Sequence, residues 1–501
     1  MYSYNIYMSS PDGEYDETMA LLSMNMLKYQ APESITAVAI RNRGQTSFNP
    51  NAYLIDSNGG QQPSLLFNVG SSFINGMQSM VNVTMTVTAT GGGAPVYFAF
   101  GNNIARAADG VTSVNSNGSF LNLISDLTVS SKSGELLVRE LYKNQTQTHK
   151  LYKIDKQRRS VLSTMGGASE INGTLQFPLY PVGKPVTFSI PLSELSTFFA
   201  SAELLPPQLL SGSIMRFTMA PPATGLVFYN STGTALVAPG TVSVNLKNMS
   251  CYLDQHELFD KVSSLILSSA LSNETSGLKY SYLTQFNTII NPTGSSFSAD
   301  IQLSAAKLIS LVLKFVPKNP WTGVVLNNGV APDKQDPTAA ACLCDLSTNK
   351  DAVGDPNSLQ FSIQCRLGSL VMPLFPVQSA TDAYQMTYNT LNPISYSGAD
   401  DCDPLKVINK LSPCCIGYPD YTRVTQQGGN QHNGVGTGST IFAFNFERSN
   451  AVNIGSLSTN NSRILSIEVN NCTNAANMQL YASCTYLAIA NVSNENVVVN
   501  K

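Results

Sequence analysis

The sequence predicts an all-β protein of two sandwich domains, and three observations lead to that prediction. The chain has 501 residues, which is too long for one hydrophobic core and enough for two domains of about 200 to 250 residues each. Apolar and polar residues alternate over 81–90, "VNVTMTVTAT", as they do in a strand with one buried face. Strand-like runs recur between loops rich in Gly, Asn and Pro, which is typical of an all-β sandwich.

The expected strands lie in both halves of the chain. The strand at 81–90 is followed by the Gly-rich turn 91–95 and the apolar run 96–100, so we expect a β-hairpin over 81–100. The other expected strands are 174–180, 185–190, 213–219, 241–249, 278–290, 308–316, 359–365, 462–470 and 480–490. This distribution fits two similar domains.

A short helix is expected between two strands in the segment 190–221, "IPLSELSTFFASAELLPPQLLSGSIMRFTMAP". Pro191 suits the first turn of a helix, because its fixed φ is already helical. Three apolar side chains then share one helical face: Leu192, Leu195 and Phe199. Pro206 and Pro207 are expected to stop this helix, because proline does not fit a helix interior.

A longer helix is expected near the midpoint of the chain, over 254–272. Asp254 and Glu257 have the spacing of a capping box. One helical face is formed by Leu258, Val262, Leu265, Ile266 and Ser269. We expect this helix to link the two domains and to pack between them.

A weak repeat supports this division of the chain. "LQF" at 175–177 precedes "IPLSELSTFF", and "LQF" at 359–361 precedes "MPLFPVQSATDAY" at 372–384. In both halves a strand is expected to end at Pro-Leu and a short helical stretch to follow. The expected organisation is an N-terminal arm with the first strands (1–50), a first domain (51–252), a linker helix (253–275) and a second domain (276–501).

Composition and charge limit the classes of partner. Charged residues make up 12% of the chain, about half of the usual ~25%, and the net charge is -3. This balance provides no overall attraction to nucleic acid or anionic lipid. The N-terminus does not have the pattern of a secretion signal and no apolar run approaches the length of a membrane span, so we expect cytosolic synthesis and no transmembrane segment.

Residues that often carry catalysis or bind metals form no recognisable motif. His149, His256 and His432 are far apart in sequence, which argues against a metal site of the cupin type. The acidic segment 399–404 lacks the ligand spacing of a calcium loop and is interpreted as a solvated turn. No nucleophile elbow with an acid and a base is found. The sequence therefore predicts no enzyme, no cofactor, no metal site and no catalytic residue.

The nine cysteines are expected to be thiols. No C-x-x-C pair is available for structural zinc, and the total is odd. The expected cytosolic compartment keeps thiols reduced. We therefore expect neither a zinc site nor a disulfide framework.

Three segments resemble a known family. "PLSELSTFFASAELLPPQLLSGSIMRFTM", "FLNLISDLTVSSKSGELL" (120–137) and "SATDAYQMTYNT" (379–390) resemble the double jelly-roll major capsid proteins of Polinton-like viruses and virophages. The resemblance implies two eight-stranded jelly rolls with short helices inserted at their flanks. It also implies a homotrimer that forms a pseudo-hexagonal capsomer of an icosahedral shell.

The same resemblance implies partners and a location. The partners would be neighbouring capsomers, penton and minor capsid proteins, and packaged double-stranded DNA. The protein would lie in the virion capsid, after synthesis in the host cytoplasm or a virus factory.

The alternative interpretation is a carbohydrate-binding or glycan-processing β-sandwich protein. Polar, amide-rich loops and 21 tyrosines suggest it. It would require clustered exposed aromatic residues or paired carboxylates in one loop, and Trp321 is the only tryptophan.

One segment, 143–160, is locally basic. It contains one acid, Asp155, and six cations: Lys143, Lys150, Lys153, Lys156, Arg158 and Arg159. In a capsid, the last five could contact the packaged genome, because phosphate contacts need only mobile cations. The alternatives are a solvated loop or a contact with an acidic patch of a neighbouring capsomer, and the net acidity of the chain favours these.

Overall fold

The fold is seen in a computed structural model, which describes the strand-rich parts of the chain. The described residues are 38–44, 53–55, 59–70, 72–90, 95–100, 119–146, 164–166, 169–171, 174–176, 178–200, 205–231, 241–257, 278–317, 358–379, 386, 390, 441–446, 459, 464–472, 478–492 and 497–500. The five basic residues expected to contact DNA lie outside these ranges: Lys150, Lys153, Lys156, Arg158 and Arg159. Their role stays a prediction.

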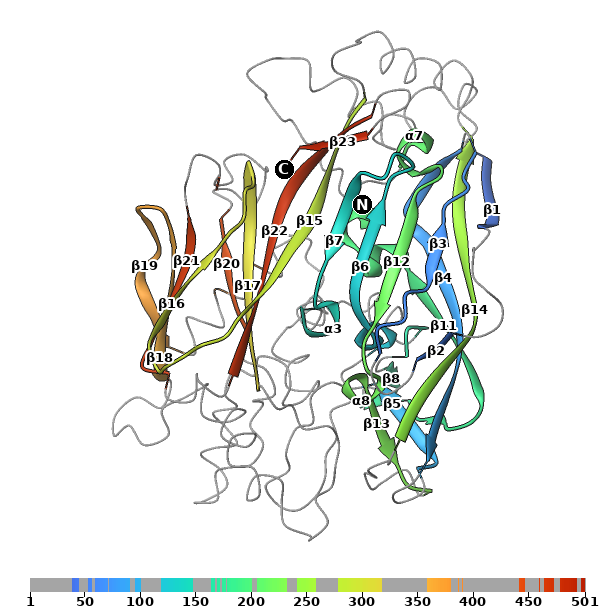
Figure 1. The fold of residues 1–501 in the computed structure, drawn as a ribbon, viewed down its shortest axis with the longest axis horizontal. Helices are drawn as coiled ribbons and strands as arrows, with labels where there is room; N and C mark the ends of the chain where they lie inside the picture. The colour runs from blue at the N-terminus through green and yellow to red at the C-terminus, as the bar shows by residue number, and fades with distance from the viewer. Residues whose placement is uncertain are drawn as a thin grey trace.

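The first half of the chain forms a sandwich of two antiparallel sheets (Figure 1). The strand order of one sheet is β1–β14–β4–β11, with β2 also paired to β14. Its strands are β1 (Val38–Gly44), β2 (Tyr53–Ile55), β4 (Phe73–Thr90), β11 (Pro185–Pro191) and β14 (Thr241–Glu257). The facing sheet has the order β3–β12–β6–β7. It contains β3 (Ser64–Leu66), β6 (Ile124–Ser130), β7 (Leu136–Glu140) and β12 (Ile214–Met219).

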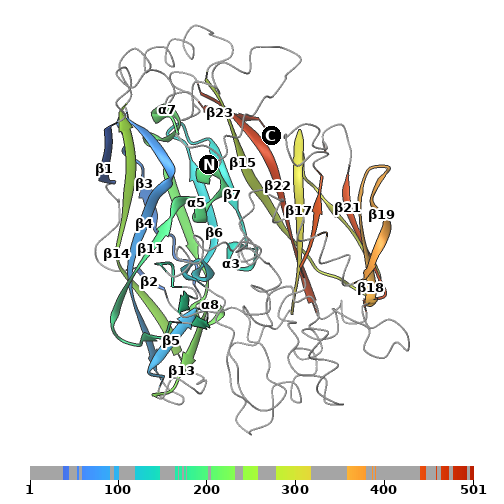
Figure 2. The same cartoon turned by 180° about the vertical axis from the view of Figure 1, so that it is seen from behind.

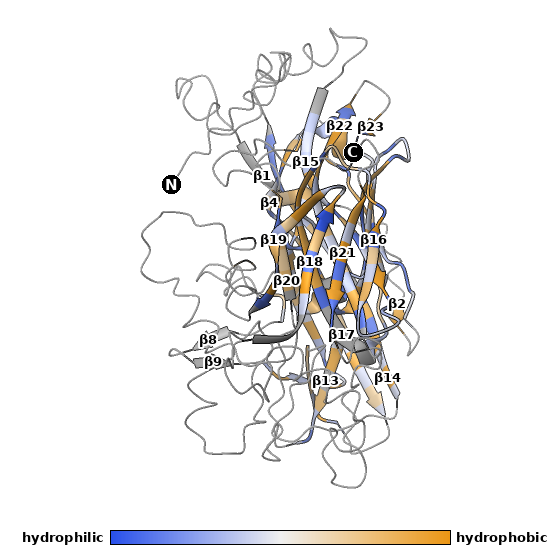
Figure 3. Cartoon of the chain, turned by 90° about the vertical axis from the view of Figure 1, so that its left-hand side faces the viewer, coloured by the Kyte–Doolittle hydropathy of each residue, from blue (hydrophilic) through white to orange (hydrophobic). Residues whose placement is uncertain are grey.

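The second half forms another sandwich beside the first. One of its sheets has the order β15–β22–β17–β20, with β23 also paired to β22. Its strands are β15 (Leu278–Ile290), β17 (Lys307–Pro317), β20 (Ile441–Asn445), β22 (Met478–Val492) and β23 (Val497–Asn500). The outer sheet has the order β16–β21–β18–β19. Figure 3 looks onto this sheet, which contains β16 (Phe297–Ile301), β18 (Ser358–Leu367), β19 (Leu370–Ser379) and β21 (Leu465–Asn470).

The two sandwiches have the same topology. In chain order, strands β1, β3, β4, β6, β7, β11, β12 and β14 of the first pair with one another as strands β15 to β22 do in the second. Eight strands in two four-stranded sheets connected in this order form a jelly roll. The predicted fold class, an all-β protein of two jelly-roll domains with short inserted helices, is confirmed. The exact domain boundaries, 51–252 and 276–501, stay predictions.

Strand β4 shows why the alternating sequence folds as it does. Val81, Val83, Met85 and Val87 are each at most 1% exposed, so the apolar face of the strand lies in the core. On the opposite face, the hydroxyl groups of Thr84 and of the cross-strand residue Thr187 lie 2.9 Å apart, within hydrogen-bond distance. The alternation therefore predicted both the strand and its buried face correctly.

The predicted hairpin over 81–100 is wrong. Strand β4 pairs with β14 and β11, whereas β5 (Tyr97–Phe100) belongs to a separate three-stranded sheet with β10 (Tyr180–Pro181) and β13 (Leu226–Tyr229). An alternating pattern shows which face of a strand is buried but does not select its partner. The expected strand 174–180 is likewise two short strands, β9 (Thr174–Gln176) and β10; β9 pairs with β8 (Ser169–Ile171).

The helical insertion after β11 is present as three short turns. They are α5 (Leu192–Leu195), α6 (Thr197–Ala200) and α7 (Pro207–Leu210). The three predicted apolar residues, Leu192, Leu195 and Phe199, are fully buried. The role of the two prolines differs from the prediction, because Pro206 is the N-cap residue of α7 and Pro207 opens its first turn. A proline at this position loses no hydrogen bond, since the first amide groups of a helix have no partner within the helix.

The repeat of this motif in the second half is not as expected. The strand was expected to end at Pro373-Leu374, but β19 continues to Ser379. In the first half, by contrast, β11 ends at Pro191 and α5 follows directly. The similarity between the halves therefore lies in their topology and not in this short motif.

The midpoint helix does not begin at Asp254. Residues Asp254 to Glu257 are the last residues of β14 and pair with Arg41 to Val38 of β1. Asp254 and His256 are buried polar residues in this strand, so the apolar-polar pattern there does not have the period of two that identifies a strand. The rest of the expected helix, 258–272, lies outside the described residues.

Candidate functional site at the junction of the two jelly rolls

The two jelly rolls meet along one edge of the first. Strand β7 and the short helices α3 (Lys143–Thr146) and α6 contact strands β15 and β22 of the second jelly roll. Figures 1 and 2 show β7 and β15 side by side in the middle of the molecule, from both sides. The buried apolar side chains of the two jelly rolls form one connected cluster. The junction is therefore part of the core.

Three side-chain hydrogen bonds cross the junction. The Tyr282 hydroxyl donates to the Leu137 carbonyl at 2.7 Å, and the Asn287 amide donates to the Leu141 carbonyl at 2.7 Å. In addition, the Thr197 hydroxyl donates to a carbonyl of β15, that of Leu283, at 2.9 Å. Strand β7 is the edge of its sheet, and an edge strand leaves backbone groups without ladder partners. The second jelly roll supplies donors for these groups.

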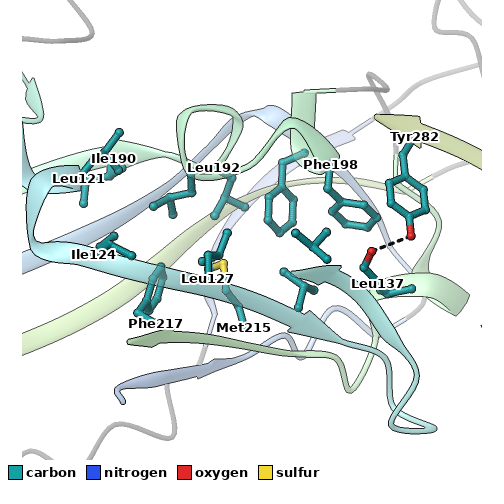
Figure 4. Packing of buried hydrophobic residues seen from close by; sticks show 14 of the residues in the cluster. Leu121, Ile124, Leu127, Leu137, Ile190, Leu192, Phe198, Met215, Phe217 and Tyr282 are labelled. Atoms are coloured by element: carbon teal, nitrogen blue, oxygen red, sulfur yellow. Dashed lines mark hydrogen bonds between the residues drawn. The ribbon is translucent and has the colours of Figure 1, made fainter. Parts of the chain in front are cut away.

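Aromatic rings fill the space around these hydrogen bonds. Phe198 of α6 lies edge-on to Tyr282, with ring centroids 4.9 Å apart, and to Tyr280 at 6.1 Å. Figure 4 shows Phe198 next to Tyr282, whose hydroxyl points to Leu137. Edge-to-face pairs of this kind add about 0.5 to 1.5 kcal/mol each beyond the apolar area that they bury. The junction therefore combines apolar packing with specific orientation.

A buried ion pair lies behind the covered edge. The Lys143 ammonium contacts the Glu140 carboxylate, and both residues are 1% exposed. Ser196 donates a 2.6 Å hydrogen bond to the other carboxylate oxygen of Glu140. Lys143 was grouped with the basic segment 143–160, but it is a structural cation inside the protein. The same network connects β7, α3 and the loop between α5 and α6.

Tyr142 turns the chain between β7 and α3. Its φ is 52°, a left-handed conformation that costs a non-glycine residue about 1 to 2 kcal/mol. The Tyr142 amide donates to the Asp126 carboxylate at 3.1 Å, and its ring lies edge-on to Tyr481 of β22 at 5.8 Å. These contacts hold the strained turn and connect it to the second jelly roll.

Burial keeps the junction hydroxyls protonated. Desolvation raises the pKa of Tyr280 and Tyr282 well above the usual value for tyrosine. The same effect raises the pKa of Tyr486, on the adjacent strand β22, to about 12. Tyr282 therefore remains a hydrogen-bond donor throughout the physiological pH range.

Side chains of the catalytic and metal-binding types are dispersed in the described part of the chain. It contains no group of three His, Cys, Asp or Glu that could hold a metal ion. His256 contacts Asp254 at 3.2 Å, but the nearby Ser79 hydroxyl accepts from the Asp254 amide and donates to the Asn75 carbonyl. These three residues therefore do not have the arrangement of a nucleophilic triad, in which the serine faces the histidine.

The cysteines that the structure describes are buried thiols outside any disulfide, as predicted. They are Cys251, Cys365, Cys472 and Cys484. The other five cysteines, His149, His432, Trp321 and the acidic segment 399–404 lie outside the described ranges. Within those ranges no helix is long and apolar enough to cross a bilayer.

The sequence analysis did not identify the junction residues. Tyr280 and Tyr282 follow the ordinary alternation of a strand, and a strand pattern does not show that a second domain will cover its outer face. The spacing of Glu140 and Lys143, three residues apart in "ELYK", was a usable signal for an ion pair. The basic residues that follow Lys143 obscure this signal, because they make Lys143 look like the first member of a basic segment.

Comparisons with known proteins agree on the fold. No protein-family model matches the chain, and no curated protein matches it in sequence. Among solved structures, the chain is similar to the Faustovirus major capsid protein, with a TM-score of 0.52 and 9% identity over 93% of this chain and 92% of that one. It is also similar to the PBCV-1 virus capsid, with a TM-score of 0.50 and 13% identity over 94% of this chain and 98% of that one. The chain is a double jelly-roll protein.

Proposed function

We propose that the chain is a viral major capsid protein of the kind found in virophages and Polinton-like viruses. Three copies would form a pseudo-hexagonal capsomer, and many capsomers would tile an icosahedral shell. The observation that supports this function best is the pair of complete jelly rolls, fused through a buried junction into one unit. The two solved structures named above are capsid proteins, and the similarity to each extends over more than 90% of both chains.

The composition suits such an assembly. Packed cores of protein interfaces are depleted in charged residues, and only 12% of this chain is charged. Three copies with two equivalent jelly rolls each would present six similar sandwiches around one axis. Near-sixfold capsomers of this kind can pack on a hexagonal lattice.

The direct test is the oligomeric state of the recombinant full-length chain. Native mass spectrometry and light scattering should give three times the 53.8 kDa mass of one chain. Negative-stain electron microscopy should show particles with a hexagonal outline. A chain that remains monomeric at high concentration would contradict the proposal.

Further partners and the location follow from the same proposal. They are neighbouring capsomers, penton and minor capsid proteins, and a place in the virion after synthesis in the host cell. A purely structural role needs no cofactor and no catalytic residue. The alternative of a carbohydrate-binding or glycan-processing protein has no supporting observation in the described residues, and binding of soluble oligosaccharides in calorimetry would revive it.

The basic residues are proposed to contact either packaged double-stranded DNA or a neighbouring capsomer; the net acidity of the chain favours a protein contact or a solvated loop, and the DNA contact can be tested directly. These basic residues are Lys150, Lys153, Lys156, Arg158 and Arg159. Trimers should bind duplex DNA weakly, with an affinity that falls steeply as salt rises, because counterions are released from the phosphates. Changing Lys153, Lys156, Arg158 and Arg159 to Ser should reduce the salt slope by about one unit for each lost contact. Absence of salt-sensitive binding at low ionic strength would leave the segment as a solvated loop or a protein contact.

A further inference from the structure

The two jelly rolls have equivalent edge strands with different surroundings. Strand β7 in the first and β19 in the second each end the sheet order, next to β6 and β18 respectively. In β7, Leu137 and Val138 are at most 3% exposed, since β15 of the second jelly roll covers this edge. In β19, Leu374 is 76% and Phe375 is 78% exposed.

The exposed pair lies on a bulge that the protein holds in place. Cys365 of β18 pairs with Met372 and Ile363 with Val377, so a single residue, Gln364, stands opposite the four residues 373–376. The Gln364 amide donates to the Pro373 carbonyl at 2.9 Å and to the Leu374 carbonyl at 3.3 Å. We call this segment, Pro373-Leu374-Phe375-Pro376, the 373–376 knob.

The knob is suited to side-chain packing and not to strand addition. Two of its four residues are prolines, which have no backbone amide to donate to an added strand. Two adjacent large apolar side chains, each more than three-quarters exposed, form an apolar surface of the kind that marks a protein contact. The bulge thus blocks edge-to-edge pairing and presents Leu374 and Phe375 outward.

The contact between the two jelly rolls within one chain indicates what could cover the 373–376 knob. The fifth strand of the first jelly roll, β7, packs on the first strand of the second, β15. The corresponding contact for β19 would be with β1, the first strand of a first jelly roll. Figure 1 shows β19 and β1 at opposite ends of the long axis. One chain therefore cannot join its own β19 to its own β1.

We propose that the 373–376 knob packs against the β1 edge of a second copy of this chain. Among the described strands, β1 pairs with β14 alone, so none of them occupies the position beside β1 that β7 occupies beside β15. A contact between unlike ends of identical chains is heterologous and forms a ring when the rotation closes. This inference rests on the proposed capsomer and assigns its inter-subunit contact to Leu374 and Phe375.

The first test changes the knob in the full-length chain. The double variant Leu374→Asp/Phe375→Asp should weaken association at each contact by at least about 100-fold, because two apolar side chains are no longer buried. Native mass spectrometry at low micromolar concentration should then show monomers. The thermal midpoint of the dissociated variant should stay within about 2 °C of that of the wild-type chain diluted until it is monomeric. Exposed residues contribute little to the stability of the fold itself. Leu374→Ser/Phe375→Ser serves as a milder second variant.

Val498→Asp is the matched control. Val498 is an apolar residue of the same jelly roll, 54% exposed, on β23, away from the knob in the sheet order. This variant should remain trimeric. If it dissociates as the knob variants do, general surface charge explains the effect and the inference is wrong.

A second test locates the partner surface. A photoreactive benzoylphenylalanine in place of Phe375 should crosslink to a peptide at or beside 38–44. Mixed isotope-labelled and unlabelled chains should show that the crosslink joins two copies. A crosslink to another region of the chain would overturn the assignment to β1.

The outcomes separate this inference from the function on which it rests. A wild-type chain that is monomeric contradicts the trimeric capsomer itself. A wild-type trimer whose knob variants also remain trimeric overturns the inference and leaves the capsomer intact. Knob variants that form trimers but no larger arrays would place the knob between capsomers, which also overturns it.

Discussion

Edge strands β7 and β19 both have backbone carbonyls without a neighbouring strand, and these carbonyls find hydrogen-bond donors in two different ways. In β7 and the residue after it, the carbonyls of Leu137 and Leu141 accept hydrogen bonds from Tyr282 and Asn287 of the other jelly roll. In β19, the carbonyls of Pro373 and Leu374 accept from Gln364 of the neighbouring strand in the same sheet. An edge strand whose carbonyls accept hydrogen bonds from another domain becomes part of the core. An edge strand whose carbonyls accept hydrogen bonds from its own sheet stays available to a partner.

The ion pair between Lys143 and Glu140 behind the covered β7 edge should contribute strongly to stability. Lys143→Met should remove the ammonium that contacts the buried Glu140 carboxylate and lower the free energy of unfolding by about 3 to 5 kcal/mol. Guanidinium denaturation of the purified chain measures this loss. A loss below about 1 kcal/mol would show that water reaches Glu140 and that the covered edge is less closed than its burial indicates.

The double variant Glu140→Gln/Lys143→Met is the control for this prediction. Without a net charge at either position, most of the lost stability should return, because the penalty comes from keeping a charged Glu140 buried after Lys143 is removed. Ser196 can still donate its hydrogen bond to the Gln side chain. A double variant as unstable as Lys143→Met would assign the effect to packing.

Two glycines, one beside the inserted turns of the first jelly roll and one in the β15–β16 loop of the second, differ in how closely their surroundings approach. A Cβ at Gly76 of β4 would clash with the Phe199 carbonyl oxygen of α6, so Gly76→Ala should cost about 1 to 3 kcal/mol through overpacking. In the second jelly roll, a Cβ at Gly294 would have its nearest neighbour at 3.9 Å. Gly294→Ala should therefore stay within about 0.5 kcal/mol. Equal denaturation midpoints for the two variants would contradict the close approach.

Strands β14 and β22 occupy equivalent positions in the two jelly rolls, and each contains a buried cysteine. Burial of these thiols should make the stability of the protein depend on pH. Burial raises the pKa of Cys251 to about 12 and also raises the pKa of Cys484. The fold favours the protonated thiol, so its contribution is fully present below about pH 8.5 and is lost as the pH rises toward 12. The stability difference between wild type and Cys251→Ala should therefore decrease by about 1.4 kcal/mol per pH unit above pH 9. A difference that is constant with pH would mean that the folded thiol titrates normally.

Two tyrosine hydroxyls at the junction differ in their hydrogen bonding. Tyr282→Phe removes the hydrogen bond to Leu137 and should cost about 1 kcal/mol. The neighbouring Tyr280 hydroxyl is buried and has no hydrogen-bond partner in the described residues. Tyr280→Phe should therefore be neutral or slightly stabilising, because it removes a desolvated polar group. If both variants lose equal stability in denaturant titrations, the hydrogen bond is not the cause.

The strands were largely predictable from the sequence, whereas their partners were not. In β4 and β22 the residues that face the core are apolar, so alternation identified each strand and its inner face. The error over 81–100 arose because the partners of β4 are β11 and β14, which lie far along the chain. The error at Asp254 arose because this part of β14 pairs with both β1 and β4 and its polar residues Asp254 and His256 are buried. Both errors concern long-range pairing, which local pattern does not contain.

The functional surfaces were less predictable for a related reason. The knob sequence "PLFP" was assigned to a strand end followed by a helix, because proline commonly marks such boundaries. Its actual role depends on Gln364, whose side chain holds the bulge across the strand pair. The junction likewise depends on Tyr282 and Leu137, which are close only after both jelly rolls have folded.

The order of the strands along the chain also determines when each edge finds its cover. The first jelly roll can close once Glu257 is available to pair with Val38, and the second closes when Val492 pairs with Leu278. Strand β7 is covered by β15 of the same molecule, so its cover arrives at an effective concentration that tethering sets and that dilution does not change. Under the proposed contact, β19 depends on an encounter with another molecule. The number of chains in the cell therefore controls when the second edge is covered, while synthesis of one chain suffices for the first.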